Sequence, residues 1–178
     1  MSLVGEALTL LNLVSSKMTF KVKGRVSGKK QRVLTIGNRL KEIADSLAHL
    51  LKLALDAKEK TEKCYKSGEE VICNICTNWW VHESDKEIAV KRLKYMTITK
   101  YSKNEAVEFY VDKSKIAITP DKYTLCYEEL CIDVPVGDLE FIERRVTDIM
   151  LILRKVEGEV HNSVNALEKC LKSLGVLT

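Results

Sequence analysis

Two long stretches with an apolar residue at alternating steps of three and four bracket the middle of the chain, and this spacing leaves few folds open. Such steps place the apolar side chains along one stripe of an α-helix. The first stripe comprises Val33, Ile36, Leu40, Ile43, Leu47, Leu50, Ala54, Ala57, Thr61 and Cys64. The second comprises Leu139, Ile142, Val146, Ile149, Leu153, Val156, Val160, Val164, Leu167, Leu171 and Leu174. We therefore expect one long helix over 33–67 and another over 137–175.

Glycine and aspartate residues mark the ends of these two helices. Gly68 is placed to be the left-handed residue after the first helix, and Asp138 is placed to be the N-cap of the second. Gly175 marks the end of the second helix. Gly158 interrupts its stripe and is the position where a kink would fall.

Residues 69–134, between the two helices, are rich in β-branched and aromatic residues and are divided by turn signals such as Pro120-Asp121. The expected strands lie within 71–82, 88–101, 106–111, 116–119, 123–127 and 131–134. Connections this short predict an antiparallel β-meander of five or six short strands. The order of helix, strands and helix predicts an α+β fold.

Two arrangements of the long helices fit this order. They form either an antiparallel hairpin with the sheet at its tip, or a layer across one face of the sheet in a compact domain. Leu51, Leu53 and Leu55 widen the first apolar face beyond what a two-stranded seam needs, so the compact arrangement is favoured. A short N-terminal helix is expected over 1–16. The 178-residue chain is thus expected to be a single domain, 1–178.

The N-terminal apolar stretch, residues 3–14, does not have the features of a secretory signal. No basic residue precedes it, Glu6 lies inside it, and no small-residue cleavage site follows it. No apolar run reaches the roughly 18 residues that a membrane span needs. The 22 lysines and 17 glutamates against one glutamine are typical of thermophile proteins. We expect a cytoplasmic protein that has no membrane partner.

Three of the six cysteines lie close together in the sequence and raise the question of a zinc site. Cys64, Cys73, Cys76 and His82 have part of the spacing of such a site. However, Cys73 and Cys76 lie in a strand-like run without a turn residue, where positions three apart point to opposite faces. The expected interpretation is that these cysteines are free and packed as small hydrophobic residues. No metal and no cofactor are predicted.

The other cysteine pair and the remaining motifs give no sign of catalysis. Cys126 and Cys131 bracket a turn, where a disulfide and an unbonded pair are equally compatible with the sequence. The chain contains no P-loop, no G-x-G-x-x-G and no G-x-S-x-G. No catalytic residues are predicted, and we expect a protein that is not an enzyme.

Positive charge is concentrated in two stretches that contain no acidic residue. The first, residues 17–32, holds Lys17, Lys21, Lys23, Arg25, Lys29, Lys30 and Arg32. The second, residues 88–103, holds Lys91, Arg92, Lys94, Lys100 and Lys103, with Tyr95 and Tyr101 between them. Residues 128–148 are predominantly acidic. The cations therefore either bind an external polyanion or face the acidic stretch, within the fold or across a subunit interface.

Trp79-Trp80 is the only tryptophan-containing site of the chain. Adjacent residues of a strand face opposite ways, so one ring is expected in the core. The second ring is then exposed or covered by a partner, unless both faces of the strand are buried. Exposed tryptophan is enriched at binding hot spots.

These features lead to two hypotheses of function. The first is a nucleic-acid-binding or assembly subunit that binds DNA or RNA weakly and without strong sequence preference through residues 17–32 and 88–103. Tyr95 and Tyr101 are expected to stack on unpaired bases if they share one side of a strand. The alternative is a protein–protein interaction module, which associates as a homo-oligomer through its heptad helices. A dimer is the favoured oligomer.

Overall fold

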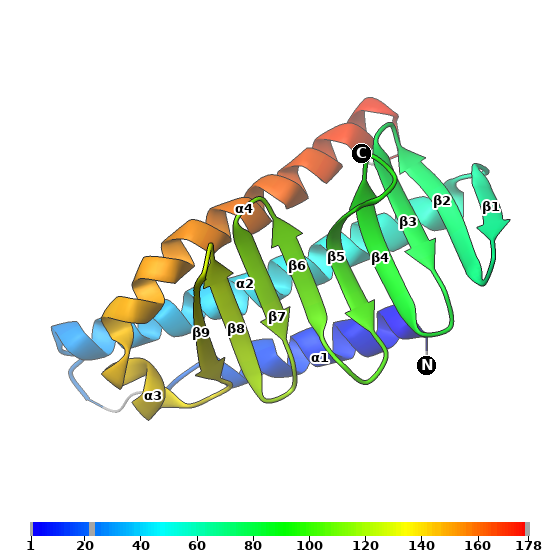
Figure 1. Ribbon diagram of the computed structural model, residues 1–178. Helices are drawn as coiled ribbons and strands as arrows, with labels where there is room; N and C mark the ends of the chain where they lie inside the picture. Colours follow the sequence, from blue (N-terminus) through cyan, green and yellow to red (C-terminus); the bar gives the residue numbers. More distant parts are fainter. Residues whose placement is uncertain (1, 22–23, 177–178) are drawn as a thin grey trace.

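The computed structural model describes residues 2–21 and 24–176 (Figure 1). The helices are α1 (Leu3–Lys17), α2 (Gly28–Lys60), α3 (Leu139–Arg144) and α4 (Val146–Ser173). The strands are β1 (Cys64–Ser67), β2 (Glu70–Cys76), β3 (Trp79–Glu83), β4 (Glu87–Arg92), β5 (Met96–Ser102), β6 (Val107–Val111), β7 (Ser114–Ile118), β8 (Lys122–Tyr127) and β9 (Leu130–Pro135). The predicted α+β class is confirmed.

The strands form one antiparallel sheet in which every strand pairs with its neighbours in sequence, from β1 at one edge to β9 at the other. The predicted meander is therefore present, with nine strands rather than five or six. Figure 1 shows the helices together against one face of this sheet. The opposite face, which no helix of the described residues covers, is called the open face below. No helix of the described residues combines the length and apolarity that a membrane span needs.

The helices α2 and α4 run parallel to each other, so the antiparallel hairpin is wrong and the arrangement on one sheet face is confirmed. Arg39 pairs with Glu157, and His49 Nε2 lies 2.7 Å from Glu168 Oε1, so both helices ascend in the same direction. The meander explains this orientation. The meander starts with β1 beside the C-terminal end of α2 and proceeds strand by strand to β9 beside the N-terminal end of α2, where α3 and α4 follow (Figure 1).

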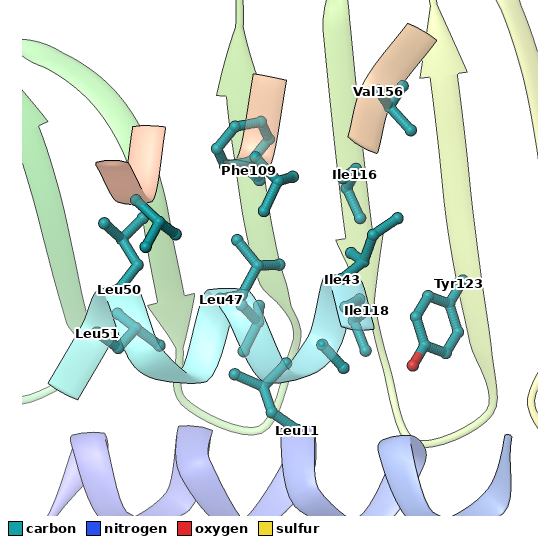
Figure 2. Packing of buried hydrophobic residues seen from close by; sticks show 14 of the residues in the cluster. Leu11, Ile43, Leu47, Leu50, Leu51, Phe109, Ile116, Ile118, Tyr123 and Val156 are labelled. Carbon is teal, nitrogen blue, oxygen red and sulfur yellow. The ribbon is translucent and has the colours of Figure 1, made fainter. Parts of the chain in front are cut away.

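The core lies between the helices and the helix-facing side of the sheet. Figure 2 shows Leu47 and Leu50 of α2 directed at Phe109 and Ile116 of neighbouring strands, with Val156 of α4 above them. These five side chains are fully buried. The wide apolar face of α2 is used as expected, because α2 packs against α1, α4 and the sheet at once.

The first long helix begins and ends earlier than the stripe predicted, over 28–60 rather than 33–67. Thr61 is already extended, with ψ 144°, and its hydroxyl donates to the Asn74 carbonyl at 2.8 Å. Cys64 belongs to β1 and pairs with Cys73 of β2. Gly68 is left-handed at φ +62°, but it lies in the hairpin between β1 and β2. Pairing with the sheet therefore overrides the end of the helical stripe.

The second long helix is divided at Arg145, between α3 and α4, and not at Gly158. Gly158 lies on the exposed side of a continuous α4. The predicted N-cap is confirmed, because the Asp138 carboxylate accepts a hydrogen bond from Phe141 N at 3.0 Å. Gly175, at φ +72°, follows the end of α4 as predicted.

Two segments that we expected to be single strands are hairpins. Residues 71–82 contain β2 and β3, which turn at Thr77-Asn78, and residues 88–101 contain β4 and β5. Their turns hold non-glycine residues at positive φ, with Thr77 at 37°, Leu93 at 52° and Lys94 at 71°. Turn signals based on glycine and proline do not find such turns.

The prediction of free cysteines is wrong, because all six cysteines form disulfides. Cys64–Cys73 and Cys126–Cys131 link residues that lie directly opposite each other on neighbouring strands. The third bond, Cys76–Cys170, joins β2 to the last turns of α4 across a separation of 94 residues. Of the two possibilities for Cys126 and Cys131, the structure shows the disulfide.

Candidate nucleic-acid interface

Basic and aromatic side chains gather on the open face of the first five strands. The strand register aligns Tyr65, Ile72, His82, Ala89 and Lys100 in one row from β1 to β5. The next row aligns Asn74, Trp80, Lys91 and Thr97. Because side chains of one row point to the same side of a sheet, both rows face away from the helices.

The ammonium group of Lys94 lies among three aromatic rings of this surface. Its Nζ is 5.0 Å from the ring centre of Tyr65, 5.4 Å from that of Trp80 and 5.5 Å from that of Tyr95. These distances are within the range of cation–π contacts. Tyr65 comes from β1, Trp80 from β3, and Tyr95 from the β4–β5 turn, so the pairing of five strands assembles the group. We call Tyr65, Trp80, Lys91, Lys94 and Tyr95 the basic–aromatic patch.

The cations of this surface have no acidic partners of their own. Among the described residues, no carboxylate lies within ion-pair distance of Lys91, Lys94 or Lys100. The pKa of Lys94 is raised above its ordinary value, chiefly by a hydrogen bond to the Tyr65 hydroxyl. Lys94 therefore carries its full charge at neutral pH.

The other half of the open face has acidic side chains. Glu108 continues the Lys100 row on β6, and Asp133 ends it on β9. The Tyr110 hydroxyl donates to Glu108, and the Thr124 hydroxyl donates to Asp133 Oδ1 at 2.6 Å. This last bond is the main reason why the pKa of Asp133 is lowered. Lys115 of β7 and Lys122 of β8 lie on the same face, and Lys122 Nζ is 3.4 Å from Asp133 Oδ2. The charges of the β6–β9 half are therefore balanced, whereas Lys91, Lys94 and Lys100 of the β1–β5 half have no acidic partner among the described residues.

His82 lies beneath the patch as a buried imidazole. It is 3% exposed, and neither ring nitrogen has a hydrogen-bond partner among the described residues. Glu70 Oε2 is 3.6 Å from Nδ1, and the Tyr95 ring meets the imidazole edge to face at 6.4 Å between centroids. Burial, and then the charge of Lys91, lower the pKa of His82 from its ordinary value of 6.5. The nearby Glu70 carboxylate and Lys94 backbone act in the opposite direction but are smaller effects, so the ring is neutral at pH 7, with one donor and one acceptor nitrogen.

The lowered pKa of His82 predicts how stability depends on pH. Since the folded state binds this proton less readily than the unfolded state, the free energy of unfolding falls as pH drops below 6.5. The variant His82→Leu has no imidazole and lacks this loss. As the pH is lowered from 7.5 to 5, its free energy of unfolding is therefore expected to increase relative to that of the wild type. Urea denaturation of both proteins at the two pH values measures this. A difference that does not change with pH would contradict the prediction.

The turn that presents Lys94 is strained. Leu93 and Lys94 both have positive φ values, which are uncommon for residues other than glycine. A hydrogen bond of 2.7 Å from Leu93 N to the Asn78 carbonyl ties this turn to the β2–β3 turn. Leu93 is 64% exposed and Met96 54%, so the turn directs large apolar side chains outward. Strain of this kind tends to cluster at functional sites.

The structure brings together four of the site residues that we predicted from 88–103 and separates two others. Lys91, Lys94, Tyr95 and Lys100 all lie on the open face or in the turn above it. Arg92 turns aside, with its guanidinium 4.8 Å from the centre of the Trp79 ring.

Tyr101 does not share a side with Tyr95, so the condition under which both tyrosines were expected to stack on bases is not met. Tyr101 is 5% exposed within the core, whereas Tyr95 is 72% exposed. A bulge between β4 and β5 changes the register between Val90 and Lys91. Such an irregularity, together with the turn, removes the simple alternation that placed both tyrosines on one side.

The basic arm, residues 17–32, lies at the opposite end of the sheet from the patch. The Gly137 N–H, beyond β9, lies 3.3 Å from the sulfur of Met18, the residue after Lys17, and Lys29 Nζ is 3.9 Å from Glu143 of α3. Figure 1 shows this segment at the β9 end of the molecule, whereas the patch is on β1–β5. Lys21 and Arg25 are exposed, and Lys23 lies outside the described residues. The two predicted basic segments therefore do not form one continuous surface.

The basic arm continues into the first turn of α2, where cations oppose the helix dipole. Lys29 and Lys30 lie in this turn, which has no acidic residue, and the Ser27 side chain does not cap it. Because α2 and α4 are parallel, the start of α4 lies nearby. The basic side chains Lys29, Arg32, Arg144 and Arg145 line a groove of about 220 Å³ there, together with Glu143 and Asp148. Cations at a helix N-terminus cost stability, and the ion pairs of Lys29 with Glu143 and of Arg145 with Asp148 offset part of this cost.

Sequence reasoning missed Tyr65 and His82 as parts of the site. Both were assigned to other roles, Tyr65 within the expected long helix and His82 among zinc-like ligands. The sequence did indicate Trp80, because adjacent strand residues face opposite ways and one of the two tryptophans was expected outside the core. This expectation is confirmed. Trp79 is 2% exposed in the core, and Trp80 lies half-buried on the open face.

The described part of the chain has no group of three or more His, Cys, Asp and Glu side chains arranged to hold a metal ion. Comparison of the chain with protein-family models, curated proteins and solved structures gave no match. The role of the site is therefore argued from its geometry and chemistry alone.

Proposed function

We propose that this chain is a non-enzymatic subunit that binds DNA or RNA weakly and without strong sequence preference. The observation that carries the proposal is the Lys94 ammonium group, held among three aromatic rings on a sheet face that no described helix covers. Proteins that bind nucleic acid without sequence preference combine cations that track the phosphates with aromatic rings that accept bases. The basic arm supplies a second, separate set of cations.

The relative strengths of the contacts favour a nucleic acid at the patch. An exposed cation–π contact stabilises by about 0.5–1 kcal/mol. A base stacked on an aromatic side chain contributes about 1–3 kcal/mol. Lys94 gives up three cation–π contacts, about 1.5–3 kcal/mol in all, when it leaves the rings. Two stacked bases contribute about 2–6 kcal/mol, and the freed Lys94 pairs with a phosphate, so the exchange is favourable.

The alternative function, self-association through the heptad helices, is less favoured, because the apolar stripes of both helices are used within the chain. Ile36, Leu40, Leu47 and Leu153 are fully buried within one chain, as is Leu167. A homo-oligomer that associates through the helices has to use their exposed side chains, such as Leu151 of α4.

We propose the cytoplasm as the location of the protein. The thermophile-like composition supports this proposal together with the three disulfides, because intracellular proteins of hyperthermophiles are often rich in disulfides. A secretory origin of the disulfides is the competing explanation.

The salt dependence of binding tests the proposed function directly. Around six phosphate contacts predict a slope of log K against log salt near −5 on duplex DNA and near −4 on single strands. Fluorescence anisotropy with labelled oligonucleotides at several salt concentrations measures both slopes. If neither DNA nor RNA binds at low salt, the proposed function is wrong.

Charge reversal in the basic arm is expected to change stability and binding in opposite directions. Lys30→Glu places an acid at the third position of α2, opposite Ser27, as in a capping box. Together with Arg32→Glu it should raise the free energy of unfolding by about 0.5–1 kcal/mol. The same double variant should reduce the salt slope on duplex DNA by about 2, because two phosphate contacts are lost.

The control for this variant reverses two exposed lysines far from the arm, Lys52→Glu with Lys169→Glu. It changes the net charge equally and is expected to leave the salt slope nearly unchanged. A gain in stability with no loss of binding in the arm variant would show that the arm does not contact phosphates.

A further inference from the structure

We infer that the basic–aromatic patch selects single-stranded nucleic acid, with unpaired bases stacking on Tyr65 and Tyr95 while Lys94 pairs with a phosphate. This inference rests on the proposed function and adds the class of ligand that the patch takes.

The two outer rings of the patch are open to a ligand. Tyr95 is 72% exposed at the tip of a turn, and Tyr65 is 42% exposed on the edge strand β1. Lys94 Nζ lies 5.0 Å from one ring centre and 5.5 Å from the other, so a single cation now holds the place of the ligand. The lysine side chain is long and flexible, and it can leave the rings without any change in the backbone. Two neighbouring bases can then stack where the ammonium group was.

His82 provides the second, independent observation. This imidazole is buried against Tyr95, and neither nitrogen makes a hydrogen bond of normal geometry within the described residues, although the Glu70 carboxylate and the Lys94 backbone lie near it. Buried polar groups without a partner are rare in native proteins and need an explanation. A base that stacks on Tyr95 brings ring nitrogens and exocyclic groups close to the imidazole. A shift of the Tyr95 ring on binding would uncover one nitrogen of the neutral His82 ring, which can then donate or accept one hydrogen bond with a base edge.

The charge of the open face fixes where the strand runs. Lys91 and Lys100 lie on the same face as Lys94 and have no ion-pair partner in the described part of the chain. On the β6–β9 half, Glu108 and Asp133 are matched by Lys115 and Lys122, so this half has no excess of positive charge for phosphates. A single strand is therefore expected to stay on β1–β5, where the cations have no acidic partner.

The bases of a duplex cannot stack on Tyr65 or Tyr95, because they are already stacked on each other and expose only their edges. Rings of the protein can receive a base only when the base is unstacked, as in single strands, loops and ends. Duplex binding, where it occurs, is expected to use the cations of the basic arm instead. The basic–aromatic patch is therefore expected to bind single strands, and the basic arm to bind duplex.

The test compares a labelled single strand of about 12 nucleotides with the matching duplex, at one low salt concentration. Poly-dT and poly-U strands serve as the DNA and RNA arms, because they carry little structure of their own. The wild type is expected to bind at least one single strand about tenfold more tightly than the duplex. The ratio of the DNA and RNA affinities shows which nucleic acid is preferred. The double variant Tyr65→Ala with Tyr95→Ala is expected to lose about tenfold or more in single-strand affinity and to keep its duplex affinity.

Three controls separate stacking from other effects. Tyr65→Phe with Tyr95→Phe keeps both rings and should retain single-strand binding. Tyr110→Ala removes a matched ring, which lies 5.6 Å from Lys115 Nζ on the same face but beside Glu108, and should leave binding unchanged. Circular dichroism confirms that each variant is folded.

The possible outcomes distinguish the inference from the proposed function. If the wild type binds nucleic acid but the double alanine variant binds single strands equally well, the inference is wrong and the proposed function stands. A preference for duplex also overturns the inference. If the alanine variant changes the oligomer mass and no nucleic acid binds, the patch is a protein interface and both proposals fail.

Discussion

Replacing Cys76 and Cys170 by alanine is expected to lower the free energy of unfolding by about 4–5 kcal/mol. The bond joins β2 to the end of α4 over 94 residues, so it closes most of the sheet into one loop. In the chain-entropy account, cross-linking so long a loop removes many conformations from the unfolded state. Guanidinium denaturation of the oxidised proteins measures the loss.

The disulfide Cys126–Cys131 offers a matched comparison, because it spans only five residues within one hairpin. Its replacement by two alanines should cost about 2 kcal/mol in the same account. The difference between the two variants isolates the effect of loop length. Equal losses would contradict the entropic origin and point instead to local packing around each bond.

Substitutions at two glycines within the long helices should have opposite effects. Gly37→Ala is expected to lower the free energy of unfolding by about 2–3 kcal/mol. A Cβ at this position would lie 2.7 Å from the Met18 carbonyl oxygen and 2.8 Å from the Phe20 ring, closer than packed atoms approach. Met18 and Phe20 follow α1, so the contact seats the start of the basic arm on α2.

Gly158→Ala is the control, since alanine favours a helix and a Cβ there meets nothing within 4 Å. It should raise the free energy of unfolding by about 0.5–1 kcal/mol. Thermal or urea denaturation of the two variants tests the pair. Stabilisation by Gly37→Ala would mean that the segment after α1 does not pack on α2 as described.

The parts of the fold that follow from local patterns could be predicted from the sequence. Apolar residues at steps of three and four identify both long helices, because a stripe of this kind must be buried. Asp138 and Gly175 act within one turn of a helix, so they were found where they were expected.

The parts that depend on pairing between distant residues could not be predicted. The stripe continues to Cys64, but the chain leaves the helix at Thr61 because β1 pairs with β2. The pairing of Cys76 with Cys170 depends on the return of α4 to the β2 end of the sheet, which no local signal contains.

The candidate site shows the same division. Positive charge along 88–103 is a property of composition, and it led to Lys91 and Lys94. Tyr65 reaches Lys94 only because β1 pairs with β2 and the β4–β5 turn bends over that edge. The bulge between Val90 and Lys91 then decides which tyrosine stays outside.

The meander across the length of α2 limits how such a protein can change in size during evolution. The nine strands span about 38 Å at 4.8 Å per step. The 33 residues of α2 extend about 50 Å. Duplication of one hairpin would widen the sheet by about 10 Å, which corresponds to roughly six residues of helix. A hairpin inserted in the sheet would therefore be tolerated only if α2 and α4 each gained about two helical turns. Relatives that differ in length should consequently differ in the sheet, in α2 and in α4 together.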